Sequence, residues 1–204
     1  MGRSVLTNEQ RSKVIMSKKA LVITSSFRKG GNSDSLAEAF ANGAREAGNE
    51  VEIISLADKT IGFCKGCLAC GKTQKCVIND DAVEIAEKMK NAETIAFATP
   101  VYYYSVSGQL KTMLDRANPL FTTDYNFRDI YLLASAAEDG EETVAGTQTA
   151  IQGWIDCYEK AKLAGTIFAG GVNDKGDIAG HQALEEAYNL SLIHISEPTR
   201  LRCI

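Results

Sequence analysis

Short apolar runs alternate with segments of helical spacing along this chain, and that alternation restricts the folds open to it. Runs rich in β-branched and other apolar residues predict buried strands at 20–24, 50–55, 94–98, 129–134 and 166–169. Apolar residues at helical spacing predict helices at 33–47, 80–90, 107–118, 142–162 and 179–190. Strands joined by helices in this way form a parallel sheet with helices on both faces. The alternation therefore predicts an α/β fold, doubly wound around a five-stranded parallel sheet with strand order 2-1-3-4-5.

A sheet of this kind binds ligands in the loops at the carboxyl ends of its strands, near the point where the strand order reverses. The loops at that position are 25–33, 99–106 and 135–141. The search for a binding site therefore starts with these three loops.

The first of these loops joins a strand to the start of a helix and is rich in groups that bind phosphate. A helix N-terminus offers unpaired N–H groups and a positive dipole end, and an arginine adds charge. The side chains available are Ser26, Arg28, Asn32 and Ser33. The loop lacks the glycine and lysine pattern of a P-loop and the glycine spacing of a dinucleotide fingerprint. An ordinary capped turn is the alternative interpretation.

The second loop follows a central strand and carries aromatic side chains. Tyrosine rings and backbone N–H groups at such an edge suit a flat heteroaromatic ligand. The residues expected to line it are Pro100, Val101, Tyr102 and Tyr103. The alternative is that the tyrosines pack beneath the loop as partly buried core.

Four cysteines lie within a short segment after the second predicted strand, so they emerge at the same edge of the sheet. They are Cys64, Cys67, Cys70 and Cys76. Thiolates this close in sequence suit one inorganic centre, and the spacing is close to that of a ferredoxin run, with a longer final gap. Zinc sites usually separate two cysteine pairs by a longer stretch. Free buried thiols and a disulfide pair remain the alternatives to a metal centre.

Composition narrows the class of protein. A net charge of −4 over 204 residues gives no general attraction to nucleic acid, and no apolar run is long enough to span a bilayer. The first residues lack the apolar region of a secretory signal, so we expect a cytoplasmic protein. In that compartment six cysteines favour metal or redox chemistry over structural disulfides.

Both ends of the chain look foreign to the fold. Residues 1–15 precede a natural-looking start at Met16 and are expected to be a non-native or disordered extension. Residues 190–200 resemble the in-frame translation of an adapter used in sequencing libraries, so 190–204 is expected to be an artefactual tail. The predicted domain is therefore 16–189, a flavodoxin-like domain by its strand order.

Taken together, these segments resemble the NADPH-dependent FMN reductase-like branch of flavodoxin-fold proteins. The first loop is similar to the family's phosphate motif, and the stretch from Pro100 to Arg116, including Asp115, resembles its ring-binding loop and following helix. The cysteine run resembles the compact motif of iron–sulfur flavoproteins, which ligate a [4Fe–4S] cluster. The resemblance implies an FMN phosphate on Ser26, Arg28, Asn32 and Ser33, a flavin ring against Pro100, Val101, Tyr102 and Tyr103, and iron on Cys64, Cys67, Cys70 and Cys76.

The resemblance further implies an NAD(P)H-dependent oxidoreductase that transfers electrons to a small molecule or a ferredoxin-like protein, as a homodimer or homotetramer. No side chain is required as a catalytic acid or base by this scheme. Two alternatives stay open: an FMN-only NAD(P)H-dependent reductase of quinones or similar acceptors with structural cysteines, and a non-enzymatic flavodoxin-like electron carrier.

Overall fold

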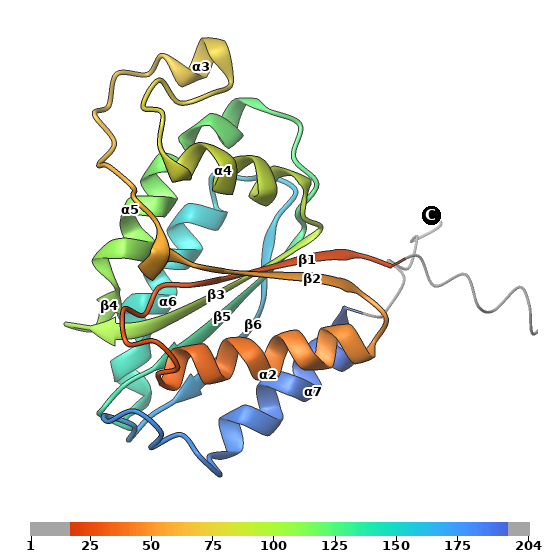
Figure 1. The fold of residues 1–204 in the computed structure, drawn as a ribbon, viewed down its shortest axis with the longest axis vertical. Coiled ribbons are helices and arrows are strands. Elements are labelled where there is room, and N and C mark those ends of the chain that lie inside the picture. Colours follow the sequence, from red (N-terminus) through yellow and green to blue (C-terminus); the bar gives the residue numbers. More distant parts are fainter. Residues whose placement is uncertain (1–16, 196–204) are drawn as a thin grey trace, which may run out of the picture.

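Five parallel strands form the centre of the computed structural model, which describes residues 17–195 (Figure 1). They are β1 (Lys19–Thr24), β2 (Glu50–Ser55), β3 (Thr94–Tyr102), β5 (Asp129–Ser135) and β6 (Lys162–Ala169). Their order across the sheet is β2-β1-β3-β5-β6, and a short β4 (Ser105–Val106) pairs antiparallel with the end of β3. The predicted order 2-1-3-4-5 is therefore confirmed for the parallel strands. The predicted extension 1–15 and residues 196–204 of the predicted tail lie outside the described residues.

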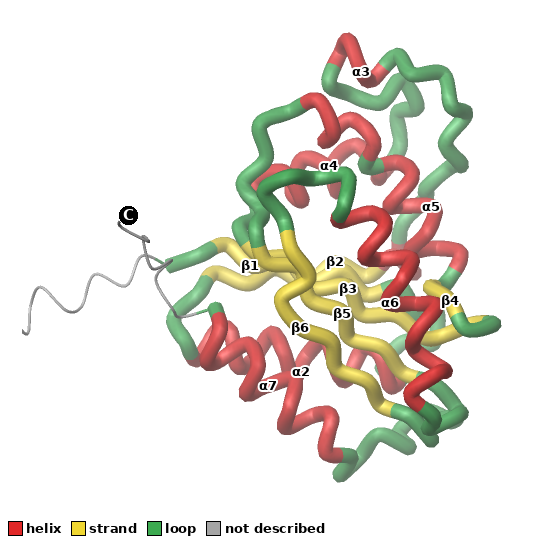
Figure 2. Tube along the Cα trace, turned by 180° about the vertical axis from the view of Figure 1, so that it is seen from behind, coloured by secondary structure: helices red, strands yellow, loops and turns green. Residues whose placement is uncertain are grey.

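Helices cover both faces of this sheet (Figure 2). One face carries α2 (Asn32–Glu46) and α7 (Gln182–His194), and the other carries α4 (Asp81–Asn91), α5 (Gly108–Arg116) and α6 (Glu141–Ile155). Three short elements lie in the connections: η1 (Leu56–Asp58), α3 (Cys70–Thr73) and η2 (Asn118–Thr122). The doubly wound α/β architecture is the one that the alternation of strands and helices predicts.

Two hydrophobic cores result from the alternation of side chains along each strand. Leu21 and Ile23 of β1 pack under α4 and α5, whereas Ala20 and Val22 pack under α2 and α7. Successive side chains of a strand point to opposite faces, so a strand that is covered on both sides is apolar throughout. This explains why the central strands read as continuous apolar runs in the sequence.

Helices α2 and α7 lie side by side in direct contact, and Gly43 makes their close approach possible. A Cβ atom at Gly43 would collide with the carbonyl oxygen of Tyr188 and the hydroxyl oxygen of Ser191. Glycine at this position therefore fixes where α7 crosses α2.

Several predicted element boundaries differ from the structure. The helix predicted over 142–162 ends at Ile155, and β6 begins at Lys162 because it pairs with β5 from Asp129 onward. The third strand continues past its predicted end to Tyr102, since it gains ladder partners in β5 and β4. Pairing across the sheet decides these boundaries, and a single segment does not contain that information.

The end of α7 also departs from expectation. The helix continues past the predicted boundary at 190 to His194, and Leu190 and Ile195 pack against the core beneath α2. Residues 190–195 are thus part of the fold, although the predicted foreign origin of the tail stays a prediction. Within residues 17–195, no helix is long and apolar enough to cross a membrane.

Candidate functional site

A cavity of about 220 Å³ lies at the carboxyl edge of the sheet, where the predicted ligand loops meet. It is built from the loop after β1, the end of β3, the residues after β5 and the loop after β6. Its lining residues include Ser26, Arg28, Asn32, Ser33, Pro100, Val101, Tyr102, Ser135, Asn173 and Lys175. The structure therefore brings seven of the eight residues predicted for a phosphate and a flat ring to one place.

The first loop turns tightly before α2. Gly30 has a positive φ of 65°, and the Gly31 N–H donates to the Arg28 carbonyl oxygen over 2.8 Å. A Cβ atom at Gly31 would lie only 2.8 Å from that oxygen, so the turn requires glycine there. Asp34, in the first turn of α2, accepts the Gly30 N–H and the Thr24 hydroxyl and holds the loop from below. The result is a compact cradle at a helix N-terminus.

Of the predicted phosphate-binding side chains, Arg28 keeps donors available, and Ser26 lies beside it with its hydroxyl bonded to the Arg28 backbone. The guanidinium of Arg28 donates from Nη1 to the Asn173 carbonyl oxygen at 2.8 Å, and this bond uses one of its several donors. The Ser26 hydroxyl lies within the turn and accepts the Arg28 N–H at 3.2 Å. A guanidinium and a hydroxyl beside a helix N-terminus suit a phosphate group.

The other two predicted side chains are used to join loops. Asn32 Nδ2 donates to the Asp174 carbonyl oxygen at 3.0 Å, and its Oδ1 accepts the N–H groups of Gly176 and Ile178. Ser33 is buried and shares a 2.7 Å hydrogen bond with Ser135. Asn32 and Ser33 therefore set the shape of the cavity by tying the start of α2 to the end of β5 and to the loop after β6.

The loop after β6 adds a cation that the sequence analysis missed. Lys175 lines the cavity, and its Nζ donates to the Lys29 carbonyl oxygen at 2.8 Å. Lys175 reaches the site only because β6 ends at the same edge as β1. Its position after the last predicted strand, in a loop rich in glycine and aspartate, was the available signal.

The three tyrosines at the end of β3 have different environments. Tyr102 lines the cavity, whereas Tyr103 is at the tip of the β3–β4 hairpin, fully exposed and, in the described chain, outside the cavity lining. Tyr103 and Tyr104 both have positive φ values, 49° and 60°. The Tyr104 hydroxyl donates to Glu138 at 2.9 Å, and this bond raises the pKa of Tyr104. Of the two tyrosines predicted to line a ring site, Tyr102 lines this cavity and Tyr103 does not, within the part of the chain that the structure describes.

The cysteine loop, residues 60–79, begins at the same edge of the sheet and then extends away over α4 and α5 (Figure 1). Cys64 and Cys67 are exposed, and Cys70 and Cys76 are half-buried; all four are free thiols. Sulfur contacts include a 3.0 Å bond from Asn118 Nδ2 to Cys70 Sγ. The donors have the chemistry that a cluster needs, but no group of three or more His, Cys, Asp or Glu side chains within residues 17–195 is placed to hold a metal ion.

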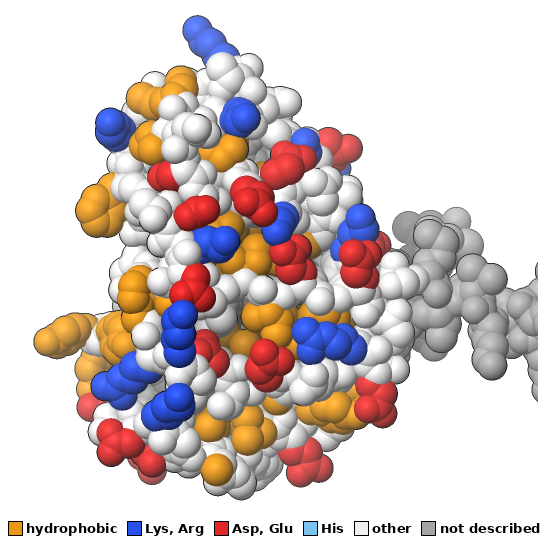
Figure 3. Space-filling view, viewed as in Figure 1, with side chains coloured by type: hydrophobic (Ala, Val, Ile, Leu, Met, Phe, Trp, Pro, Cys, Tyr) orange, Lys and Arg blue, Asp and Glu red, His pale blue; other side chains and the backbone are white. Residues whose placement is uncertain are grey.

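The surface of the cysteine loop is apolar and basic (Figure 3). Phe63 and Leu68 are 81% and 73% exposed. From Thr60 to Asn79 the charged residues are all lysines. The loop is therefore positively charged, whereas the whole chain has a net charge of −4.

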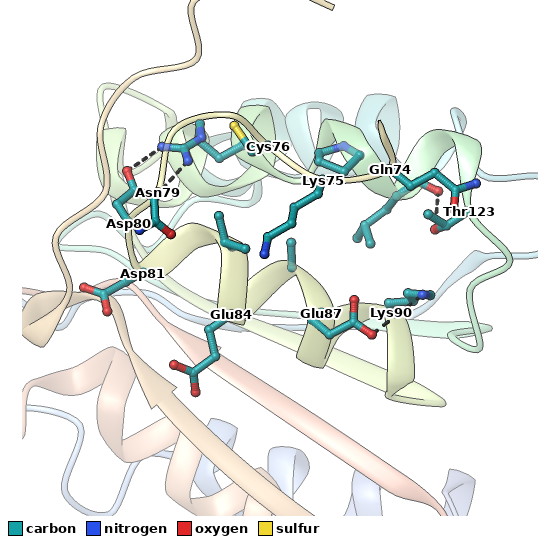
Figure 4. Close-up of a pocket in the computed structure, with 15 residues that line it drawn as sticks. Gln74, Lys75, Cys76, Asn79, Asp80, Asp81, Glu84, Glu87, Lys90 and Thr123 are labelled. Carbon is teal, nitrogen blue, oxygen red and sulfur yellow. Dashed lines mark hydrogen bonds and ion pairs between the residues drawn. The ribbon is translucent and has the colours of Figure 1, made fainter. Parts of the chain in front are cut away.

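A second, larger cavity of about 540 Å³ lies beneath this loop, between α4 and η2 (Figure 4). Cys76 lines it together with Lys75, Glu84, Glu87 and Lys90, and Asp80 and Arg116 close one end. Arg116 was expected to belong to a ring-binding segment, but the structure places its side chain at the base of the cysteine loop. Asp115, the neighbouring residue, forms an exposed ion pair with Lys111.

The Asp80–Arg116 pair is the buried charge pair of this region. The guanidinium is fully covered and the carboxylate is 12% exposed, with a shortest separation of 2.6 Å. Burial by itself would raise the pKa of Asp80, but the hydrogen bonds from Arg116 and the Gly62 N–H outweigh it and hold that pKa below its ordinary value. The hydrogen bond to Asp80 raises the pKa of Arg116. Both groups are therefore charged at neutral pH.

Comparison with known proteins gives a match of residues 18–199 to the family described as NADPH-dependent FMN reductase. An iron-sulfur flavoprotein of Methanocaldococcus jannaschii is 40% identical over 134 residues, covering 66% of this chain and 68% of that protein. An iron-sulfur flavoprotein of Methanosarcina thermophila is 29% identical over 181 residues, covering 89% and 91%. The solved structure of NAD(P)H:quinone oxidoreductase from Methanothermobacter marburgensis gives a TM-score of 0.70 at 19% identity, covering 86% of this chain and 95% of that chain, and shows a shared fold.

Proposed function

Because the chain belongs to the NADPH-dependent FMN reductase family and is an FMN-dependent oxidoreductase that uses NAD(P)H, we propose that the cavity at the carboxyl edge of its sheet is the FMN site. The observation that carries the proposal is the convergence of Arg28, Lys175 and the N-terminus of α2 beside the end of β3. Cationic donors at a helix N-terminus bind a phosphate, and the adjoining β3 end offers a surface for a ring.

Each part of the cavity has a role in this proposal. Arg28, Lys175 and Ser26 bind the phosphate, while Asn32 and Ser33 hold the surrounding loops in place. Pro100, Val101 and Tyr102 form the wall against which the ring lies. FMN, when bound, supplies the redox chemistry, since a flavin takes up two electrons as hydride and releases them singly or in pairs. The chain binds and orients the flavin and shields it from water.

Ligand identity tests the FMN proposal directly. The purified full-length chain is denatured, and the released ligand is identified by mass spectrometry. FMN is the expected species, because the cavity has a single phosphate cradle. FAD or a nucleoside triphosphate as the dominant ligand would overturn the proposal.

We further propose that Cys64, Cys67, Cys70 and Cys76 bind a [4Fe–4S] cluster. The support is the donor set of four free thiols in one loop and the likeness to proteins named iron-sulfur flavoproteins. The described loop does not gather three or more of these donors, so binding would require the loop to close further. An FMN-only reductase is the second candidate, and the same spread of the donors favours it.

An anaerobic preparation separates these two candidates. Iron, acid-labile sulfide and flavin are measured per chain, and NADPH or NADH is then added under an absorption spectrometer. Iron and sulfide together with flavin support the cluster. Flavin without iron, reduced by NADPH or NADH, supports the FMN-only reductase. Flavin that neither nucleotide reduces would contradict both candidates and support a non-enzymatic electron carrier.

A further inference from the structure

We propose that Arg116 is the positioning residue of the cysteine loop: its guanidinium fastens the two ends of the loop together, so that the four thiols are presented from one closed loop. The inference rests on the proposed role of this loop as the cluster site. The evidence is the set of contacts, the burial and the charge of Arg116, and none of these contacts involves the proposed FMN cavity.

Arg116 donates to a backbone carbonyl group at each end of the cysteine loop. Nη1 donates to the Gly62 carbonyl oxygen at 2.7 Å, and Nη2 donates to the Ile78 carbonyl oxygen at 3.0 Å. Gly62 comes shortly before Cys64, and Ile78 comes shortly after Cys76. One planar side chain therefore bridges both ends of the segment that contains every proposed ligand.

Asp80 fixes the orientation of the Arg116 guanidinium. Asp80 accepts from Nη1 at 2.6 Å and from Nη2 at 2.8 Å, the bidentate arrangement that suits arginine and carboxylate. The same carboxylate accepts the Gly62 N–H at 2.9 Å and the Ala82 N–H at 3.1 Å, the latter at the start of α4. Asp80 thus connects the loop entrance, the loop exit and a rigid helix.

Between its two ends the loop carries large apolar side chains that stay exposed: Phe63, Leu68 and Val77 are 81%, 73% and 61% exposed. Ile61, just before Gly62, is partly buried against the core, so apolar packing acts at the loop entrance and not on the segment that carries the cysteines. Arg116, by contrast, is 1% exposed. A buried ion pair is a poor source of stability compared with apolar residues of similar size, so its use here points to a specific geometric task.

One N–H donor of Arg116 is not used by its contacts with Asp80 and the two carbonyl groups. Arg116 Nε is buried and has no hydrogen-bond partner among the described residues, and Arg116 and Cys76 line the same cavity. Figure 4 shows Cys76 and Asp80 at the same end of this cavity. The same side chain that closes the loop therefore also places a positive charge beside the last of the four cysteines.

Thiol alkylation in the metal-free, full-length chain tests the positioning role without any activity assay. Rates are followed for each cysteine by peptide mass spectrometry and normalised to Cys157, an exposed free thiol just after α6. Arg116→Lys keeps a charge but loses the fork that bridges two carbonyl groups. We expect Cys76 to react roughly tenfold faster in this variant, because the loop opens locally more often.

Arg128→Lys is the matched control, since Arg128 also donates to backbone carbonyl groups, but those of residues 125–127, which are not part of the loop. Its alkylation pattern should equal that of the wild type. FMN affinity is measured for both variants and should stay within about twofold, because the FMN cavity is built from other loops. If Arg116→Lys does not fold by this criterion, Asp80→Asn loosens the same clamp and should give the same change at Cys76.

Anaerobic reconstitution supplies the second readout. Arg116→Lys should take up less than about half of the wild-type iron, and the residual cluster of Arg116→Gln should have a more negative midpoint potential, since a cation beside a thiolate ligand is removed. If the wild type takes up no iron, the cluster proposal fails while the alkylation result still decides the clamp. Wild-type alkylation rates, together with unchanged iron and potential in the Arg116 variants, would overturn the inference.

Discussion

Arg28 and Lys175 bring two positive charges to the N-terminus of α2, and Arg28 is the one whose removal is most informative. Arg28→Ala removes a charged donor and also the bond to the Asn173 carbonyl oxygen that holds the far wall of the cavity. We expect FMN binding to weaken by about 1.5–3 kcal/mol, the range for a hydrogen bond to a charged group. Calorimetric titration of the flavin-free chain measures this loss.

Arg45→Ala is the control for that measurement, because Arg45 lies at the other end of the same helix and pairs with Glu38 on the surface. Its FMN affinity should match the wild type. An unchanged dissociation constant for Arg28→Ala would mean that the phosphate binds elsewhere.

Asp80 is the residue whose titration should be visible in stability. Burial raises the pKa of Asp80, but the hydrogen bonds from Arg116 and Gly62 lower it by more than burial raises it. The folded-state pKa therefore lies below the ordinary value of 3.8. A lowered pKa stabilises the fold above the unfolded-state value, and the contribution is lost as the pH falls through the folded-state value. At neutral pH, Asp80→Asn should cost about 3 kcal/mol, because it leaves Arg116 buried without its counter-charge.

Urea unfolding of the wild type and Asp80→Asn over a series of pH values checks this assignment. The difference in unfolding free energy should be constant from neutral pH to about pH 5 and should shrink below about pH 4. A difference that does not change with pH would show that the carboxylate charge is not what stabilises this position.

At the scale of single elements, the β3–β4 hairpin combines two non-glycine residues with positive φ and a fully exposed tyrosine. Tyr103→Gly relieves strain of about 1 kcal/mol and adds chain entropy of about 0.5–1 kcal/mol in the unfolded state, so the free energy of unfolding should change by less than about 1 kcal/mol. FMN affinity should be unchanged if the site lies within one chain. Thermal unfolding and flavin titration measure both; a large loss of affinity would show that Tyr103 contacts the flavin.

The last turn of α7 should contribute to the thermal stability of the chain. Chains that end at Asn189 and at Ile195 differ in the buried contacts of Leu190, Ser191 and Ile195. Each large apolar side chain contributes about 1.5–3 kcal/mol when buried, so the shorter chain should unfold at a clearly lower temperature. Equal melting temperatures in calorimetry would support the prediction that 190–204 is a tail which adds nothing to the stability of the fold.

At the scale of the whole molecule, the proposed FMN cavity and the cysteine loop start at one edge of the sheet but are built from separate segments. The cavity uses the loops after β1, β3, β5 and β6, whereas the cysteine loop follows β2 and lies over α4 and α5. Cys67→Ser and Cys70→Ser should therefore each remove most of the iron and leave FMN bound, because the phosphate cradle is untouched. Anaerobic iron and flavin analysis of the two variants, beside Cys157→Ser as a control, measures this separation.

The sequence by itself determined the strand order, the edge of the sheet where the proposed FMN cavity lies and most of the residues that line this cavity. These follow from local information: buried strands are apolar throughout, and the switch in strand order fixes where loops converge. Ser26, Arg28, Pro100 and Tyr102 could be predicted because each is at the end of a recognisable strand or the start of a helix.

The tertiary structure alone decided what depends on contacts between distant segments. Lys175 joins the first loop because β6 ends beside β5, and Asn32 is occupied by the backbone of the loop that contains Lys175. Arg116 serves the cysteine loop because α5 ends beneath it, a pairing of residues 62, 78, 80 and 116 that no local pattern contains. The physical reason is that a hydrogen bond or a buried ion pair needs a partner at about 3 Å, and chain folding alone brings such partners together.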